Sequence, residues 1–386
     1  MDNYIFRPNQ IIFNNQRNPY TINITNTIGE GSYAIIYDVE IIYNNNVYTN
    51  YCMKIGKINE ISDEVMEYIN NSPYFINVYK VIRNINRDDL KQLDIILPVR
   101  GDNLDIMIMD KVDYDLRKFC SELGGATVSM KFMNYIAKTL FHLCIDMYNN
   151  DMYYFDLKAD NIGIIERNNK VVIKIIDIDS LHKINEDEFF DQVTDETSPY
   201  YDNNRDYTNI FRLQILACVF TMLQILFNNE TDTTCNIIRK LLEIDPQLQM
   251  EYNGFDCNSF KSIFVSYVLS DNYSKDRTKN IIYNFLQQED QAAAAARPRF
   301  GRRRLQQQPV DNNVVNEDND KIASFVSNII EILHQILRGN MQTTVRFINS
   351  VFPRENNIFV SIMDTTNFDV KVDKYYKMLV NLIRNM

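Results

Sequence analysis

The sequence predicts an α+β protein, in which a β-rich first part precedes a mostly helical second part. Up to residue 109, short runs of alternating apolar and polar residues are separated by turns, which is typical of half-buried strands. From residue 128 onward, apolar residues recur every three or four positions, as they do on one face of a helix. Strands followed by helices indicate that the two kinds of element are segregated in the fold.

Composition and charge limit the function. With 386 residues, of which 45% are hydrophobic, the chain can bury a large core. Its net charge of −11 argues against nucleic acid as the main partner, because phosphate neutralisation needs a basic surface. No secretory signal and no membrane span are visible. The six cysteines lie far apart and there are only three histidines, so we expect reduced thiols in a cytoplasmic protein and no metal cluster.

The β-rich part begins with an Asn-rich segment, residues 1–26, for which we expect a lead-in strand or a partly ordered arm, and it continues as a strand, a glycine turn and a second strand. The turn contains Gly29 and Gly31, small residues that let backbone N–H groups approach a phosphate closely. Two glycines are weak evidence alone, because most such matches are ordinary hairpins. The next strand, 47–55, carries Lys54, which in isolation would be an exposed strand lysine.

The centre of the chain holds the most informative stretch. A polar loop with Asp156, Lys158 and Asn161 is followed by a hairpin predicted over 161–176, which ends at Asp177. Phosphoryl transfer needs a carboxylate that accepts the proton of the attacking hydroxyl, and oxygen ligands for Mg²⁺. Asp156 suits the first role, and Asn161 and Asp177 suit the second.

This stretch resembles the catalytic loop and metal-binding segment of protein kinases, in which an Asp, an Asn five residues later and a further Asp follow in this order. The resemblance implies a two-lobed protein kinase-like fold over 27–286 that binds ATP with Mg²⁺ or Mn²⁺. Lys158 matches the kinase lysine two residues after the catalytic Asp, where it neutralises the γ-phosphate.

The same resemblance makes the glycine turn a phosphate-binding loop, although Ala34 stands where kinases have a third glycine. Lys54 then holds the α- and β-phosphates, and a helical glutamate fixes its position. The helix predicted over 59–70 offers Glu64 for this pairing, with Glu67 as the alternative. The nucleotide-binding residues implied in the turn are Ile28, Gly29, Glu30, Gly31, Ser32, Tyr33, Ala34 and Ile36.

A hinge between the lobes is implied at 110–112, where backbone groups of Asp110 and Val112 would bond the adenine edge and Met109 would border its pocket. The small lobe would then span 27–109 and the large lobe 113–286. Helices predicted over 128–148 and 206–228 form the centre of the large lobe, with Asp206 available to bond the catalytic loop.

Two departures from the kinase pattern affect the interpretation. Tyr154 and Phe155 replace the usual His-Arg before the catalytic Asp, which argues against switching by loop phosphorylation. Asp179 replaces the usual glycine of the metal-binding motif. An Asp-x-Asp motif and an AT-biased composition are similar to the vaccinia-type poxvirus kinases and other serine/threonine kinases of large DNA viruses. A viral protein of this kind would act in the host cytoplasm or the virion.

After residue 286 the composition changes. Residues 287–320 combine an alanine run, a basic patch and a polar acidic run, which predicts a flexible linker. Amphipathic patterns over 321–338, 341–352 and 371–385 predict a small helical C-terminal module, 321–386, that packs on the lobes or binds a partner protein.

We therefore expect a serine/threonine protein kinase that acts on a protein substrate, away from membranes and nucleic acid. Two alternatives stay open. A small-molecule phosphotransferase of the choline or aminoglycoside type would share Asp156, Asn161 and Asp177, but such enzymes usually lack a lysine at the position of Lys158. A pseudokinase used as a binding scaffold is the second, given Ala34 and Asp179.

Overall fold

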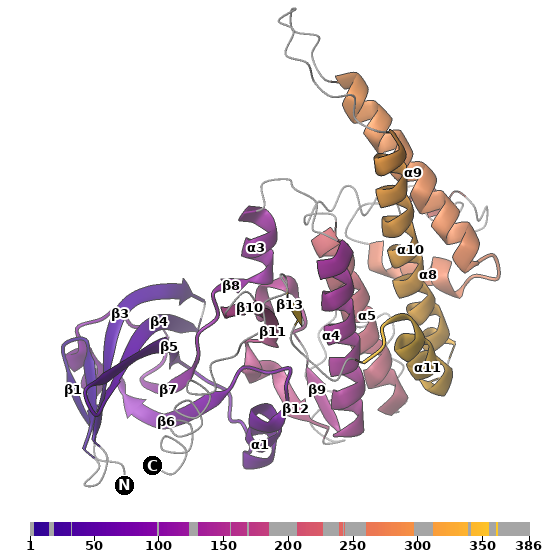
Figure 1. Ribbon diagram of the computed structural model, residues 1–386. Coiled ribbons are helices and arrows are strands. Elements are labelled where there is room, and N and C mark those ends of the chain that lie inside the picture. The colour runs from indigo at the N-terminus through magenta and orange to yellow at the C-terminus, as the bar shows by residue number, and fades with distance from the viewer. Residues whose placement is uncertain are drawn as a thin grey trace, which may run out of the picture. The chain divides into compact units, whose positions relative to one another are not determined.

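A computed structural model gives the fold of the chain (Figure 1). It contains two compact units. The sheet unit comprises Met1–Leu116, Asp160–His182 and Asn357–Met386, and the helical unit comprises Arg117–Ala159 and Lys183–Asn356. The structure describes residues 4–14, 19–31, 33–98, 100–122, 130–154, 156–167, 170–184, 207–226, 239–241, 243, 260–296, 312–338, 341–354 and 360–361.

The sheet unit is built on a curled, seven-stranded antiparallel sheet (Figure 1). Its strands follow the order β1-β2-β3-β4-β5-β7-β6, so only the last two depart from the chain order. Apolar side chains from most of these strands form one continuous core. The strands are β1 (Tyr4–Arg7), β2 (Gln10–Phe13), β3 (Tyr20–Glu30), β4 (Ala34–Tyr43), β5 (Asn46–Gly56), β6 (Val78–Asn86) and β7 (Asn103–Asp110).

Local sequence explains these elements. Burial alternates along most of β4, because successive side chains of a strand point to opposite faces. Asn44 and Asn45, both with positive φ, form the two-residue turn to β5, a conformation that Asn tolerates better than most residues. Helix α1 (Asp63–Asn71) begins after Ser62, whose hydroxyl accepts a hydrogen bond from the N–H of Val65. The short helices α2 (Arg87–Leu90) and η1 (Lys91–Leu93) connect β6 to β7.

A smaller antiparallel sheet of the same unit contains the predicted central hairpin. Its order is β13-β11-β10-β8, with β10 (Ile162–Arg167) paired to β11 (Lys170–Ile175). The hairpin prediction over 161–176 is therefore confirmed. The outer strands are β8 (Tyr114–Asp115) and β13 (Val360–Ser361). In the chain, β9 (Met152–Tyr154) and η2 (Ala159–Asn161) precede the hairpin of β10 and β11, and η3 (Ile178–Ser180) and β12 (Leu181–Lys183) follow it.

The helical unit packs around α4 and α5, which are largely buried (Figure 1). Helix α10 packs against α5, α8, α9 and α11. The Nε2–H of His142, on α4, donates to the carbonyl of Phe352 at 2.8 Å, and burial lowers the pKa of this imidazole. The helices are α3 (Leu116–Glu122), α4 (Met130–Asn149), α5 (Tyr207–Leu226), α8 (Phe260–Leu269), α9 (Lys275–Ala296), α10 (Asn312–Leu337) and α11 (Met341–Val351).

The structure differs from the expected segment boundaries. The described residues within 1–26 include β1, β2 and most of β3, which belong to the seven-stranded sheet, so they agree with a lead-in strand and not with an arm. The linker expected over 287–320 is helical at both ends, since α9 continues to Ala296 and α10 begins at Asn312. The described helices of the expected C-terminal module belong to the same unit as α4 and α5. The helix predicted over 371–385 lies outside the described residues.

Two further expectations concern cysteines and membranes. The described thiols of Cys52, Cys144 and Cys218 are buried and free of disulfides. Burial, reinforced by nearby carboxylates, raises the pKa of the Cys52 thiol to about 12, so this cysteine is unreactive at neutral pH. Among the helices in the described part of the chain, none has the length and hydropathy that a membrane crossing requires.

Candidate active site

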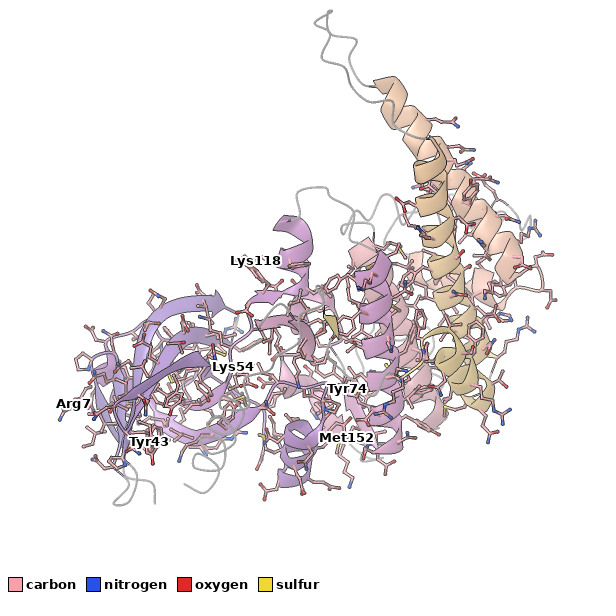
Figure 2. The ribbon with its side chains drawn as sticks, viewed as in Figure 1. Arg7, Tyr43, Lys54, Tyr74, Lys118 and Met152 are labelled. Atoms are coloured by element: carbon pink, nitrogen blue, oxygen red, sulfur yellow. The ribbon has the colours of Figure 1, made fainter. Side chains whose placement is uncertain are left out.

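Lys54 lies near the end of β5, a strand flanked by β4 and β7 in the seven-stranded sheet (Figure 2). On its two sides, Ile36 of β4 and Met107 of β7 are its partners in the strand register. Met109, two residues further along β7, is buried. Three of the residues predicted to bind nucleotide, Ile36, Lys54 and Met109, are thus placed on neighbouring strands of one sheet.

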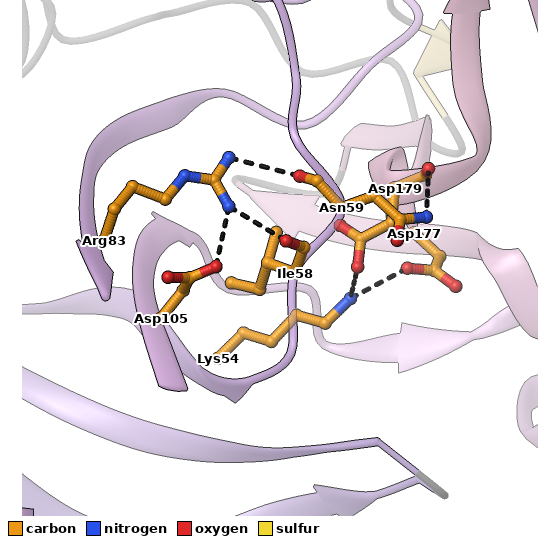
Figure 3. Close-up of polar contacts among 7 residues, drawn as sticks. All are labelled: Lys54, Ile58, Asn59, Arg83, Asp105, Asp177 and Asp179. Carbon is orange, nitrogen blue, oxygen red and sulfur yellow. Dashed lines mark hydrogen bonds and ion pairs between the residues drawn. The ribbon is translucent and has the colours of Figure 1, made fainter. Parts of the chain in front are cut away.

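The ammonium of Lys54 contacts two carboxylates (Figure 3). Its Nζ lies 3.0 Å from Oδ1 of Asp177 and 2.6 Å from Oδ2 of Asp179. The side chains of Lys54 and Asp179 are only 13% and 14% exposed, whereas that of Asp177 is 37% exposed. Burial by itself lowers the pKa of Lys54, but the two carboxylates outweigh it, so the pKa is raised and the lysine stays charged.

Asp179 retains one oxygen without a partner. Its Oδ2 binds Lys54, while Oδ1 is buried and has no hydrogen-bond partner among the described residues. Burial raises the pKa of this carboxyl, and the charge of Lys54 opposes that shift. An unpaired buried carboxylate oxygen is costly, so it marks a position where a further cation or donor would be stabilised.

The hairpin brings Asn161 to the chain segment that carries Asp177. The carbonyl of Asn161 accepts a hydrogen bond from the N–H of Ile176 at 3.0 Å, directly before Asp177. Asn161 is 7% exposed, and its position at the base of β10 follows from the antiparallel register of β10 with β11. The two predicted metal ligands are therefore joined through the backbone at the open end of this hairpin.

The expected pairing of Lys54 with Glu64 is not present in the structure. The ion pairs of Lys54 are those with Asp177 and Asp179, and the side chains of Glu64 and Glu67 are exposed on α1. Helix α1 begins only at Asp63, nine residues after Lys54, and the carboxylates that reach the ammonium come from the chain beyond β11 instead.

The glycine turn joins β3 to β4, as predicted. The N–H of Gly31 donates to the carbonyl of Ala34 at 2.9 Å, and the β3–β4 register shifts twice before Gly29. Such bulges alter the direction of a strand and are frequent beside functional sites. Ser32 lies outside the described residues, while Ile28, Glu30 and Tyr33 are exposed.

Packing does not explain the two glycines of the turn. A Cβ atom on Gly29 would meet Ile36 at 3.5 Å, and one on Gly31 would meet the Ala34 carbonyl at 3.6 Å, which are ordinary contacts. By contrast, a Cβ on Gly56 or Gly163 would collide with neighbouring atoms. Gly56 and Gly163 are thus required by the fold, whereas the described residues around positions 29 and 31 leave space for a side chain that these glycines do not have.

The predicted hinge continues from β7. The N–H of Asp110 donates to the carbonyl of Asn77 at 3.1 Å, and its buried carboxylate accepts from the Asn77 side chain at 2.7 Å. The N–H of Lys111 donates to the carbonyl of Asn50 at 2.9 Å. No hydrogen bond to the backbone of Val112 is found within the described parts of the chain, so its N–H and C=O are available to a ligand.

Asp156 and Lys158 belong to the helical unit. The Nζ of Lys158 lies 2.6 Å from Oδ2 of Asp156, and the side chains are 47% and 41% exposed. The predicted neighbour Phe155 lies outside the described residues. This exposed pair places an ammonium beside a carboxylate, which is the combination that a hydroxyl acceptor and an incoming phosphoryl group need.

Two polar side chains of α5 hold the loop around Asp156, and the sequence interpretation missed both. Gln214 donates through Nε2 to the carbonyl of Tyr154 at 2.7 Å, and Thr221 donates to the carbonyl of Leu157 at 3.3 Å. Both side chains are buried, which is unusual for polar groups in an apolar helix. Asp206, expected in this role, lies outside the described residues.

Comparisons with known proteins complete the description of the site. No protein-family model matches the chain, and no curated protein matches it either. Among solved structures, the chain is similar to a double mutant of the PknI kinase domain of Mycobacterium tuberculosis. The identity is 11%, the TM-score is 0.35, and the match covers 54% of this chain and 74% of that one. With so low a TM-score, the assignment of function depends on the side chains described above.

Proposed function

We propose that this chain is an ATP-dependent protein serine/threonine kinase, which transfers the γ-phosphoryl group of ATP to a hydroxyl of a protein. The observation that carries the proposal is the buried contact of Lys54 with Asp177 and Asp179. An ammonium held between two carboxylates in a sheet is expensive to desolvate, and such groups are concentrated at functional sites.

The residues present fit a magnesium ion. Asp179 has a buried Oδ1 without a described partner, and Asp177 is partly exposed. Mg²⁺ typically takes one or two carboxylates and completes its shell with phosphates and water. For this reason the finding that no described group of three or more His, Cys, Asp or Glu side chains could hold a metal does not conflict with the proposal. Asn161 and Asp177 would hold the ion, which supplies positive charge to the nucleotide phosphates.

The chain's own groups then divide the work. Lys54 would bind the α- and β-phosphates, and the side-chain-free positions Gly29 and Gly31 would admit the phosphates to the backbone N–H groups of the turn. The N–H and C=O of Val112 would bond the adenine edge. Asp156 would orient the acceptor hydroxyl and take its proton, while Lys158 would neutralise charge on the transferred group.

A phosphoryl-transfer assay tests the proposal. Purified full-length protein is incubated with γ-³²P-ATP and Mg²⁺ or Mn²⁺, and with either casein and myelin basic protein or choline and kanamycin as acceptors. We expect labelled protein acceptors, and a loss of at least about 10²-fold for Asp156→Asn, because a general base contributes about this much.

The acceptor arms distinguish the alternatives. Label found on choline or kanamycin and not on protein would replace the proposal with a small-molecule phosphotransferase. Binding of Mg-ATP without transfer to either kind of acceptor would identify a pseudokinase. Full activity of the Asp156→Asn variant would contradict the role of Asp156.

A further inference from the structure

We infer that Asp179, held in place by Asn59 and Arg83, positions Lys54 and thereby does the work expected of a glutamate on α1. The inference rests on the proposed function, since Lys54 is the group that would bind the phosphates. It adds Asp179 to that site as a positioning residue, in place of the glutamate expected on α1.

The contact of Asp179 with Lys54 is the stronger of the two that Lys54 makes. The Nζ–Oδ2 distance of 2.6 Å is shorter than the 3.0 Å to Asp177, and Asp179 is the more buried carboxylate. Charged hydrogen bonds shielded from water are stronger than exposed ones. Asp177, at 37% exposed, is the carboxylate that remains open to a ligand, while Asp179 is the one buried against the lysine.

The backbone of Asp179 is fixed independently of its side chain. The side-chain amide of Asn59 donates to the carbonyl of Asp179 at 3.2 Å (Figure 3). This bond ties the residues after β11 to the segment that follows β5, the strand of Lys54. Lysine and carboxylate are thus connected twice, once through their side chains and once through Asn59.

Arg83 holds the segment that carries Asn59. From β6, its guanidinium donates to the carbonyl of Ile58 at 3.0 Å and to the carbonyl of Asn59 at 3.2 Å (Figure 3). The same guanidinium donates to Oδ2 of Asp105 at 2.8 Å, which anchors it to β7. A planar guanidinium that binds three acceptors fixes their relative positions well. The sheet itself therefore sets the position of Asn59, and through it that of Asp179.

Helix α1 takes no part in this arrangement. Its exposed Glu64 and Glu67 are not among the ion-pair partners of Lys54. The carboxylate that fixes the lysine is instead on the same short segment as the predicted metal ligand Asp177. The Lys54–Asp179 contact is thus made by β5 and the segment after β11, without an ion pair from the glutamates of α1.

The first test is a double-mutant cycle in the phosphoryl-transfer assay. If Asp179 acts through Lys54, Asp179→Asn should reduce kcat/KM for ATP by at least tenfold in the wild-type background. It should add less than twofold in the Lys54→Arg background, where the positioned ammonium is already lost. Equal losses in both backgrounds would overturn the inference and leave Asp179 as a metal ligand alone.

Three comparison variants sharpen the cycle. Asn59→Ala removes only the outer hydrogen bond, and should raise the KM for ATP two- to fivefold in a protein that folds normally. Glu64→Gln should reduce kcat/KM for ATP less than Asp179→Asn does. The reverse order would mean that Glu64 of α1, and not Asp179, positions Lys54. Asp63→Asn, an equally exposed acid-to-amide change at the start of α1, is the control and should match the wild type.

A second test does not depend on catalysis. Amine-reactive labelling of the full chain, read by mass spectrometry of the Lys54 peptide, reports how well the ammonium is held. Asp179→Asn should increase labelling of Lys54 at least threefold, with Lys118 as the internal reference. Unchanged labelling would contradict the inference even in an active enzyme. If the wild type transfers no phosphate, the proposed function fails, while this measurement still decides the role of Asp179.

Discussion

The two sets of charged residues in this chain are held in opposite ways. In the sheet unit, Lys54 is 13% exposed and lies between two carboxylates, so its position depends on charge. In the helical unit, Lys158 is 47% exposed beside Asp156, and such exposed pairs contribute little to stability. There the loop is positioned by hydrogen bonds from α5 to its backbone. Charge therefore fixes the lysine in the sheet unit, whereas in the helical unit hydrogen bonds to the backbone, and not the exposed ion pair, position the loop.

The largest effect should follow from Lys54→Met. Removing one partner of a buried ion pair leaves uncompensated carboxylates, and we expect a loss of about 3 kcal/mol in the free energy of unfolding. Transfer activity should fall at least about 10²-fold, because the phosphates lose their positioned cation. Far-UV circular dichroism during denaturant unfolding measures the stability, since the chain has no tryptophan.

Asp156→Asn is the matched comparison for that variant. It should lose activity to a similar extent but change the unfolding free energy by less than about 0.5 kcal/mol, as exposed positions usually do. Equal destabilisation by the two substitutions would mean that the buried ion pairs of Lys54 contribute no more to stability than the exposed pair of Asp156 and Lys158.

A smaller effect is expected for Gln214→Leu. The substitution removes the donor to the Tyr154 carbonyl, and a buried acceptor without a partner costs about 1–3 kcal/mol. The true value should lie near the lower end, because the Oε1 of Gln214 is itself buried without a described partner and is removed as well.

The control for this variant is on the same helix. Gln224→Leu has the same change in side chain at a half-buried position, for which no such bond is found among the described residues, and should leave unfolding and activity near those of the wild type. If Gln224→Leu were the more damaging variant, the hydrogen bonds from α5 would not be what positions the loop.

The smallest effect concerns pH. Burial lowers the pKa of His142 below its usual value of 6.5, so below that pH the unfolded chain binds a proton that the folded chain does not. This contribution to stability is present above pH 6.5 and is lost as the pH falls toward the folded pKa. His142→Gln keeps a donor for the Phe352 carbonyl and does not titrate.

We therefore expect the free energy of unfolding of the wild type to fall, relative to that of His142→Gln, as the pH is lowered from 7.5 to 5.5. The slope is at most about 1.4 kcal/mol per pH unit, the value for one proton. Taking the difference between the two proteins cancels the carboxylates common to both. A difference independent of pH would mean that His142 is not held neutral in the folded chain.

Local patterns predicted the elements that carry the site but not all of its contacts. The hairpin that ends at Asp177 and the helix before Asp156 follow from periodicity, which is a local property. The partners of Lys54 are 123 and 125 residues away in the chain, and helical spacing on α1 could only offer candidates nearby. The acidic residue at position 179 could have indicated the contact, since kinases usually have a glycine at this position, two residues after the metal-binding Asp.

Other misses have similar physical reasons. The sequence left residues 1–26 open between a strand and an arm, because many Asn residues disfavour strands, whereas Phe6, Ile11 and Phe13 are buried in the core. The roles of Gln214 and Thr221 were not predicted, since their acceptors are backbone carbonyls that a sequence pattern does not reveal. Polar residues two helical turns apart in such a helix are a sign of this kind of contact.

The two hydrogen bonds from α5 limit insertions and deletions between Gln214 and Thr221. Gln214 and Thr221 are seven residues apart, close to two full helical turns, and this interval matches the separation of their two carbonyl acceptors. One residue inserted between them would rotate one side chain by about 100° away from its acceptor, and a deletion would rotate it equally in the other direction. Related sequences should therefore vary in length on either side of this interval and keep seven residues within it.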